Sequence, residues 1–170
     1  MAGVTAEIAL GITATITGTN DLGSPKMRIE PISILTQFTE GTAAVGQANV
    51  LFSDTRTIAA SATENIDLAG ALTDAFGTTI TAAEVVAIYV KADAANTNNV
   101  VVGNASSNGF VGPMGATGVY AVKPGEYFLA TSQSGWAVTA ATGDLLKIAN
   151  SGGTTGITYD IIVIGRTVAA

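Results

Sequence analysis

The sequence predicts an all-β protein, built as an antiparallel β-sandwich or barrel in a single domain. About ten segments rich in strand-forming residues follow one another at intervals of roughly 8–12 residues. Turn residues separate these segments, and the chain holds 20 glycines and 4 prolines. No segment has the sustained helical period that a TIM barrel or a doubly wound fold requires. At 170 residues the chain has the length of one domain, covering residues 1–170.

The strongest strand signal is the C-terminal segment 157–165. Turn residues 151–153 precede it, and Gly165 closes it. Apolar residues occupy both parities from Ile161 to Ile164. Because successive side chains in a strand point to opposite faces, this run predicts a central strand that is covered on both faces.

The first strand is expected over residues 5–17, where apolar residues recur at every second position. The intervening positions hold small or polar residues, so the pattern predicts one core face and one polar face. This strand pairs either within its own subunit or with the sheet of a neighbour, and residues 1–25 are a candidate N-terminal strand or arm. The alternating apolar residues are Ile8, Leu10, Ile12, Ala14 and Ile16.

A second strand is expected from Met27 to about Thr39, after a turn cluster at 19–25. Met27 and Ile29 share one parity, whereas the apolar residues from position 32 onward take the other. Pro31 lies at this change of parity. Since proline has no amide hydrogen for the ladder, we expect a β-bulge or a sheet-crossing bend there.

The next part of the chain contains shorter elements. A loop is expected at 40–46, short strands at 47–52 and 56–59 on either side of Ser53 and Asp54, a strand at 62–68, and a single helical turn at 70–77.

Residues 82–91 permit two interpretations. Thr81 and Glu84 are spaced as in a capping box, which predicts a helix over 82–91. The segment that follows is rich in β-branched and aromatic residues, which favours a strand over 85–91. We favour the strand.

The C-terminal half is predicted to consist of further short strands. Residues 103–118 form the longest irregular stretch, and a turn is expected around Ser134 and Gly135. The strands are expected at 100–102, 119–123, 127–131, 136–139 and 145–149.

The charge pattern argues against several partners. The chain has 7 basic and 13 acidic residues, a net charge of −6, and its cations are scattered. Nucleic-acid binding requires a concentrated positive surface, so we expect none. No apolar run approaches the ~18 residues of a membrane span, and the N-terminus lacks the pattern of a signal peptide. The absence of cysteine permits assembly in a reducing cytoplasm.

No catalytic, cofactor or metal site is expected. The chain has neither histidine nor cysteine, and no Gly-x-Ser-x-Gly motif occurs. The carboxylates of Asp54, Asp67 and Asp74 lie at turns, without the arrangement that a glycosidase requires. Asn20 and the asparagine cluster at 96–99 lack the pattern of a calcium loop and are typical of ordinary turns. We therefore expect a protein that is not an enzyme.

Interaction surfaces are the more informative candidates. Charged residues make up 12% of the chain, about half of the ~25% that is usual. This indicates either a surface of Thr, Ser and Asn, which is common in β proteins, or a surface partly covered by other protein subunits, and we favour the second. The loop at 103–118 either tucks its apolar side chains beneath itself or offers them to a partner. Trp136 is expected to be a core anchor, and a sugar-stacking platform is the alternative. The candidate interface residues are Phe110, Val111, Met114, Ile8, Leu10 and Ile12.

Several segments of the C-terminal half follow one another in a distinctive order. They are the apolar strand 85–91, Val-Val-Val-Gly at 100–103, Val-Lys-Pro-Gly-Glu-Tyr-Phe at 122–128, Gly-Trp-Ala-Val at 135–138, Asp-Leu-Leu-Lys-Ile-Ala-Asn-Ser-Gly-Gly at 144–153 and Tyr-Asp-Ile-Ile-Val-Ile-Gly at 159–165. With these segments, residues 66–168 resemble small virion proteins of tailed bacteriophages, the proteins that decorate or cement the outside of a capsid. The resemblance implies a jelly-roll-like β-sandwich, usually a homotrimer, bound at junctions between subunits of the major capsid protein and lacking an active site.

We therefore expect a non-catalytic capsid decoration protein, assembled in the host cytoplasm and located on the surface of the virion. Three alternatives remain open. The first is a tail-fibre or baseplate module that binds glycan, the second is a self-assembling capsid or tube subunit, and the third is an enzyme such as a polysaccharide depolymerase.

Overall fold

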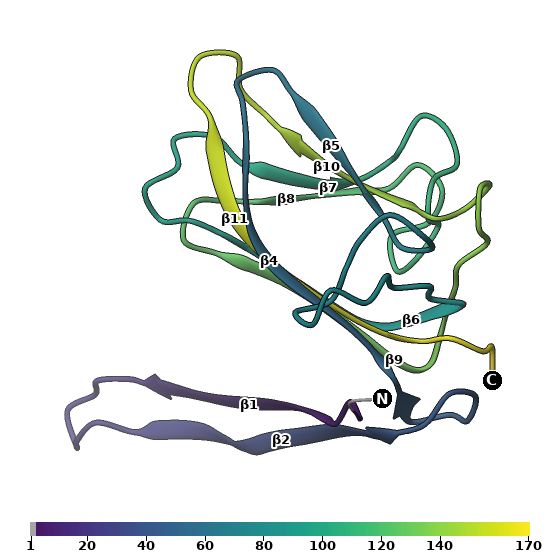
Figure 1. The fold of residues 1–170 in the computed structure, drawn as a ribbon. Coiled ribbons are helices and arrows are strands. Elements are labelled where there is room, and N and C mark those ends of the chain that lie inside the picture. The colour runs from purple at the N-terminus through teal and green to yellow at the C-terminus, as the bar shows by residue number, and fades with distance from the viewer. Residues whose placement is uncertain (1–2) are drawn as a thin grey trace.

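The computed structural model describes residues 3–170 and confirms the all-β class. Eleven strands form three sheets, and the described residues contain no helix (Figure 1). The strands are β1 (Ala6–Thr17), β2 (Lys26–Glu40), β3 (Gln47–Ala48), β4 (Val50–Ile58), β5 (Thr63–Asp67), β6 (Glu84–Ala92), β7 (Val100–Gly103), β8 (Val119–Val122), β9 (Tyr127–Ala137), β10 (Leu145–Asn150) and β11 (Ile157–Arg166).

Two antiparallel four-stranded sheets form a β-sandwich. One has the strand order β4-β11-β6-β9, and the other has the order β5-β10-β7-β8. Apolar side chains from both sheets fill the space between them, among them Ile88 and Ile161 from the first sheet and Val102 and Ile148 from the second, all fully buried. The sandwich therefore has one continuous core.

The predicted closing strand is β11, and its central position is confirmed, because it lies between β4 and β6. Its inward side chains, such as Ile161 and Val163, are fully buried. On the outer face Ile164 is buried, whereas Ile162 is 37% exposed. Coverage on both faces therefore holds only at the end of β11 near Ile164.

Two local predictions between residues 47 and 77 are wrong. The expected break at Ser53 and Asp54 does not exist, because both residues take ladder positions in β4, opposite Ile162 and Ile161 of β11. Residues 70–77 form turns and no helical turn. The Asp74 carboxylate accepts hydrogen bonds from the backbone amides of residues 76 and 78, both at 2.8 Å, which stabilises a turn.

The strand at 85–91 is confirmed as β6, which pairs with β11 on one side and β9 on the other. Because this segment is buried between two neighbouring strands, it forms a strand, although the capping-box pattern favours a helix. Glu84, which completes the capping-box pattern, instead pairs with Arg166.

The strands expected at 127–131 and 136–139 are one strand, β9. Its ladder with β6 is interrupted, since Thr131 lies opposite Ala87 whereas Trp136 lies opposite Val85. Residues 132–135 therefore bulge from the ladder where a turn was expected. Trp136 is half-buried against the core, as expected of a core anchor.

The first two strands form a long antiparallel hairpin, which we call the arm (residues 6–40). In Figure 1 the arm runs below the sandwich and extends away from it. It belongs to the third sheet, of order β1-β2-β3, in which β2 pairs with the short parallel strand β3. Among residues 3–170, β1 thus has a ladder partner on one side only.

Candidate interaction surface

A bulge gives the arm one continuous apolar face. Leu10 lies opposite Ile34 and Ile12 opposite Ile32, but Ala14 lies opposite Ile29. β2 thus carries one extra residue in the segment that contains Pro31, as the change of parity predicted. The extra residue returns Met27 and Ile29 to the same face as Ile32. We call the following seven residues the apolar face: Leu10, Ile12, Ile16, Met27, Ile29, Ile32 and Ile34.

The apolar face is uncovered. Its residues range from 42% exposed at Leu10 to 67% exposed at Met27. Together these residues expose roughly 700 Å², backbone atoms included, which is comparable with the ~300–600 Å² of the largest apolar patch on a typical monomer. The size of this patch makes one side of the hairpin a candidate contact surface.

The opposite face of the arm is mainly polar. By the ladder register it carries Thr13, Thr15 and Arg28. Near the root, the Gln37 side chain donates a hydrogen bond to the Glu7 carboxylate at 2.9 Å. Leu35 is the exposed apolar residue on this side. The arm is therefore amphipathic, as the alternation in residues 5–17 predicted. The prediction that its apolar side is a core face is wrong beyond the root, because Leu10, Ile12 and Ile16 are exposed.

At its root the arm is fixed to the sandwich. Phe38 of β2 is buried with Val86, Ala87 and Ile164 on the outer face of the sheet β4-β11-β6-β9. Ile8 packs against the same cluster and is half-buried. At the root, the apolar side of the arm therefore packs on a β-sheet. Farther from the sandwich, the same side of the arm is exposed.

Beside the root, a largely apolar cleft of about 450 Å³ lies between the arm and the sheet. Glu7 and Ile8 of the arm line one wall, and Tyr89, Leu129 and Ile162 line the other. Tyr89 also packs against the exposed Tyr127, with ring centroids 5.8 Å apart.

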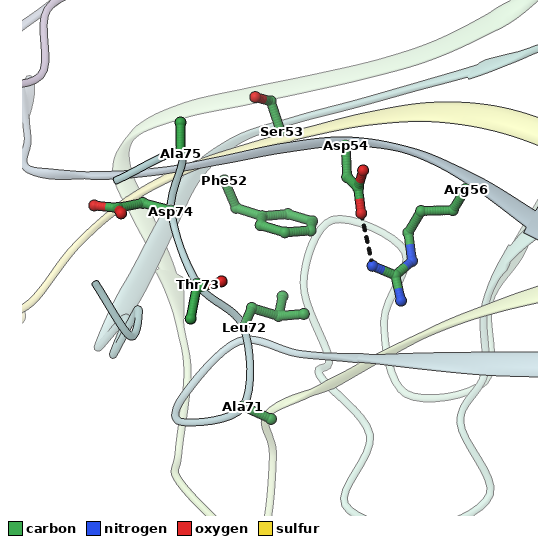
Figure 2. Close-up of a pocket in the computed structure, with 9 residues that line it drawn as sticks. All are labelled: Phe52, Ser53, Asp54, Arg56, Ala71, Leu72, Thr73, Asp74 and Ala75. Carbon is green, nitrogen blue, oxygen red and sulfur yellow. Dashed lines mark hydrogen bonds and ion pairs between the residues drawn. The ribbon is translucent and has the colours of Figure 1, made fainter. Parts of the chain in front are cut away.

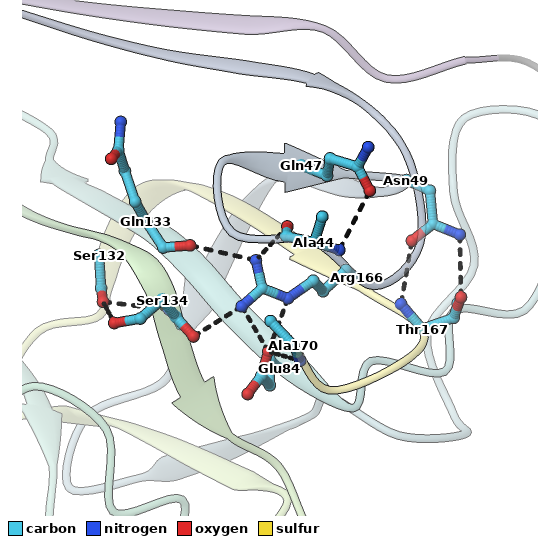
Figure 3. Close-up of polar contacts among 11 residues, drawn as sticks. Ala44, Gln47, Asn49, Glu84, Ser132, Gln133, Ser134, Arg166, Thr167 and Ala170 are labelled. Carbon is cyan, nitrogen blue, oxygen red and sulfur yellow. Dashed lines mark hydrogen bonds and ion pairs between the residues drawn. The ribbon is translucent and has the colours of Figure 1, made fainter.

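Arg166 holds the root in place. Its guanidinium is fully buried and donates to the Glu84 carboxylate at 2.6 Å. It also donates to the carbonyl of Ala44, in the loop that follows β2, at 3.1 Å. Two further bonds reach the carbonyls of Gln133 and Ser134 in the bulge of β9 (Figure 3). One side chain thus ties the arm's exit loop to two strands of the sandwich.

We call the hydrogen bonds of Arg166 the clamp, and neighbouring residues support it. Gly135 has a φ of 78°, and a Cβ there would lie 3.1 Å from the Arg166 guanidinium, so glycine suits this position. Asn49 exchanges two hydrogen bonds of 2.9 Å with Thr167 (Figure 3). Sequence reasoning counted Arg166 only as a scattered cation. The available signal was a charged residue at the end of a buried apolar strand, which must have a partner.

A second charged cluster contains Arg56 of β4 and lies beside a pocket of about 430 Å³ (Figure 2). Arg56 pairs with Asp54 at 2.9 Å and with Glu64. The buried Tyr159 hydroxyl donates to Glu64 at 2.9 Å. Burial, and then the Glu64 charge, raise the pKa of Tyr159 well above its ordinary value. The hydrogen bond to Glu64 raises the pKa of Arg56.

The charged groups around this pocket bond to one another or to backbone. Asp54 pairs with Arg56, and the Asp74 carboxylate accepts two backbone amides. Outside the pocket, Asp67 likewise accepts the amide of Ala69 at 2.9 Å. The contacts of Asp67 and Asp74 close turns, whereas the Asp54–Arg56 pair lies within β4.

The other candidate interface residues have different surroundings. Phe110 is 7% exposed and lies in the core, and Met114 packs against that core. For the loop at 103–118, the alternative in which apolar side chains point inward therefore describes Phe110 and Met114. Val111 is exposed. Leu10 and Ile12 lie on the apolar face, and Ile8 lies at the root.

Residues 3–170 include no cluster of three or more acidic side chains that could hold a metal ion. Asn20 accepts the amide of Leu22 at 3.1 Å, the hydrogen bond of an Asx turn. Within the same residues, no helix is long and apolar enough to cross a membrane. Comparison with protein-family models, curated proteins and solved structures finds no match.

Proposed function

We propose that this protein is a non-catalytic virion structural protein that decorates and stabilises a tailed-phage capsid by binding between coat subunits. The observation that carries the proposal is the apolar face of the arm. A sandwich with its own closed core has no folding requirement for an extended hairpin that leaves seven large apolar residues, with roughly 700 Å² of total surface, exposed to water. Such a surface belongs to a protein whose working state is an assembly.

The jelly-roll topology belongs to this proposal. The eight strands from β4 to β11 divide between two sheets in the orders β4-β11-β6-β9 and β5-β10-β7-β8. Neighbours in each sheet are mostly distant in sequence, as nested Greek keys require. Double-sheet jelly rolls are common in viral capsid proteins, which supports the resemblance that residues 66–168 suggest.

The surface chemistry suits adhesion by distributed contact. Charged residues are 12% of the chain, and the charged clusters at Arg56 and Arg166 are satisfied internally. A decoration protein contributes to shell stability through apolar contact area, at about 25 cal/mol per Å² before association costs. No single side chain need dominate that contact.

A glycan-binding role is the second candidate, and one observation favours it. Tyr127 is exposed and stacks beside Tyr89, which gives a small aromatic surface. Trp136 packs against the core, so it is not that platform. Titration with phage-host surface polysaccharide, followed by tyrosine and tryptophan fluorescence, tests this role.

The test of the main proposal is co-sedimentation with phage heads that lack their decoration protein. We expect saturable pelleting of the protein with the heads, and heads that then resist heating better than bare heads. Pelleting without heads would instead favour the self-assembling capsid or tube subunit. A soluble protein that ignores every head offered would contradict the proposal.

A further inference from the structure

We infer that the apolar face of the arm is the surface by which copies of this chain bind one another, arm against arm. The inference deepens the proposed function by naming how its homo-oligomer forms. It rests on that function only for its biological setting, since it concerns the isolated chain.

The first argument is area. The apolar face presents roughly 700 Å², close to the ~800 Å² per partner that a standard protein–protein interface buries. Two such faces would cover each other with little left over. The cleft beside the root, at about 450 Å³, gives side chains at the edge of that contact a place to enter.

The second argument is charge. The whole chain carries a net charge of −6, so two copies repel each other at long range. The seven residues of the apolar face carry no charge, and Arg28 belongs to the opposite face by register. Two acidic residues lie at its margin, Glu7 in the lining of the cleft and Glu30 in the bulge of β2. Contact through the apolar face itself therefore brings none of its own residues' charges out of water.

The third argument is shape and continuity. The apolar face is one side of a two-stranded sheet, and β-sheets pack face to face about 10 Å apart. The same side of the arm already packs in this way at the root, where Phe38 lies on Val86 and Ile164. A second arm supplies, for the outer part, the apolar layer that the sandwich supplies at the root.

Neighbouring residues on β2 provide a matched pair of variants. Ile34 lies on the apolar face and is 51% exposed, whereas Leu35 lies on the opposite face and is 55% exposed. The double variant Ile32→Thr/Ile34→Thr keeps β-branched side chains and removes apolar surface from the proposed contact. Leu35→Thr removes a similar apolar side chain from the other side of the same strand.

The experiment is sedimentation equilibrium of the full chain over a range of concentrations. We expect wild type at a multiple of the 17.0 kDa chain mass, and Leu35→Thr with an unchanged dissociation constant. Each Ile→Thr change should raise that constant roughly tenfold, so the double variant should sediment as a monomer at low concentration. Circular dichroism and Trp136 fluorescence confirm that each variant keeps its fold.

Cross-linking locates the contact. The chain has no cysteine, so a single introduced cysteine is unique. Ile12→Cys should link two chains efficiently through a short bis-maleimide, whereas Thr13→Cys on the opposite face should not. Equal cross-linking at both positions would overturn the inference.

The outcomes separate the two proposals. A monomeric wild type at ~100 µM, or a double variant that keeps the wild-type mass, overturns the arm-to-arm contact. If that monomer still binds heads and Ile32→Thr/Ile34→Thr abolishes the binding, the coat protein covers the apolar face and the proposed function survives. An arm-dependent oligomer that ignores heads leaves the inference standing and contradicts the proposed function.

Discussion

Arg166 shows how much of the arm's geometry depends on one buried side chain. It is the charged residue that joins the exit loop of the arm, the bulge of β9 and Glu84 of β6. A buried ion pair is weak evidence for stability as such, but removing one partner leaves the other charge and several carbonyls without hydrogen bonds.

Arg166→Met should therefore destabilise the protein by about 3–5 kcal/mol, because Glu84 would remain buried without its partner. Urea unfolding followed by Trp136 fluorescence measures the change. Arg28→Met, at an exposed position of the arm, is the control and should have little effect. An unchanged urea midpoint for Arg166→Met would mean that the clamp does not contribute to folding.

Tyr159 predicts a loss of stability in alkali. Its pKa is raised in the folded protein, chiefly by burial and then by Glu64, above the value of about 10 for an unfolded tyrosine. The folded state keeps its proton while the unfolded state releases it, so the contribution is full below pH 10 and falls as pH rises. Between pH 10 and 11 the contribution of Tyr159 to the free energy of unfolding should decrease by about 1 kcal/mol.

The variant Tyr159→Phe isolates the contribution of the Tyr159 hydroxyl to the free energy of unfolding. The variant is expected to be less stable than wild type at pH 7 by about 1 kcal/mol, because the hydrogen bond to Glu64 is lost. The gap between the two proteins should then narrow above pH 10. Unfolding free energies measured at pH 7, 10 and 11 give the comparison, and parallel curves would exclude Tyr159 as a source of alkaline sensitivity.

At the scale of elements, the arm separates into a root that contributes to the fold and an outer part that does not. Phe38 is 2% exposed in the root cluster, whereas every residue of the apolar face is substantially exposed. The outer hydrogen bonds join β1 only to β2. The sandwich therefore gains little stability from the outer arm.

Replacing residues 12–32 by Asn-Gly should shorten the hairpin through a tight turn between Gly11 and Ser33, which already lie opposite each other. We expect the unfolding free energy of the monomeric sandwich to change by less than about 0.5 kcal/mol. Phe38→Ala, by contrast, should cost about 3–5 kcal/mol through the cavity it leaves. Urea unfolding compares them, and a large loss on shortening would show that the outer arm supports the core.

The elements also show where sequence reasoning succeeds. The change of parity at Pro31 predicted a β-bulge or a sheet-crossing bend, and the structure has the bulge, because a period-two pattern records which face each residue joins. The same pattern predicted a core face, which is wrong for the outer arm, because alternation does not show what covers a face. The break predicted at Ser53 and Asp54 failed because turn propensity is weak against nine residues of continuous pairing with β11.

At the scale of the whole molecule, an assembly held by apolar faces should respond to salt in a definite way. The seven residues of the apolar face carry no charge, so raising NaCl from 50 to 500 mM should not weaken the oligomer. Sulfate should strengthen it, because excluded salts favour apolar burial. Sedimentation across the salt series measures this, and dissociation at high NaCl would indicate ion pairs in the contact.

The whole fold was more accessible from sequence than the site. Short strands, abundant turn residues and the apolar C-terminal strand were enough to predict an all-β sandwich from the sequence. The clamp at Arg166 could not be predicted, because its carbonyl partners at Ala44 and Gln133 are backbone groups brought together by long-range pairing. Phe110 could not be placed either, since a glycine-rich loop permits a ring to turn inward or outward.

The single-sided pairing of β1 has a consequence for handling the protein. Its outer margin offers unsatisfied amide and carbonyl groups along twelve residues that include neither lysine nor proline, the residues that usually discourage strand addition. Concentrated preparations kept away from their natural neighbours should lengthen this ribbon one chain at a time, so fibrous deposits that bind amyloid dyes are the expected fate of prolonged storage.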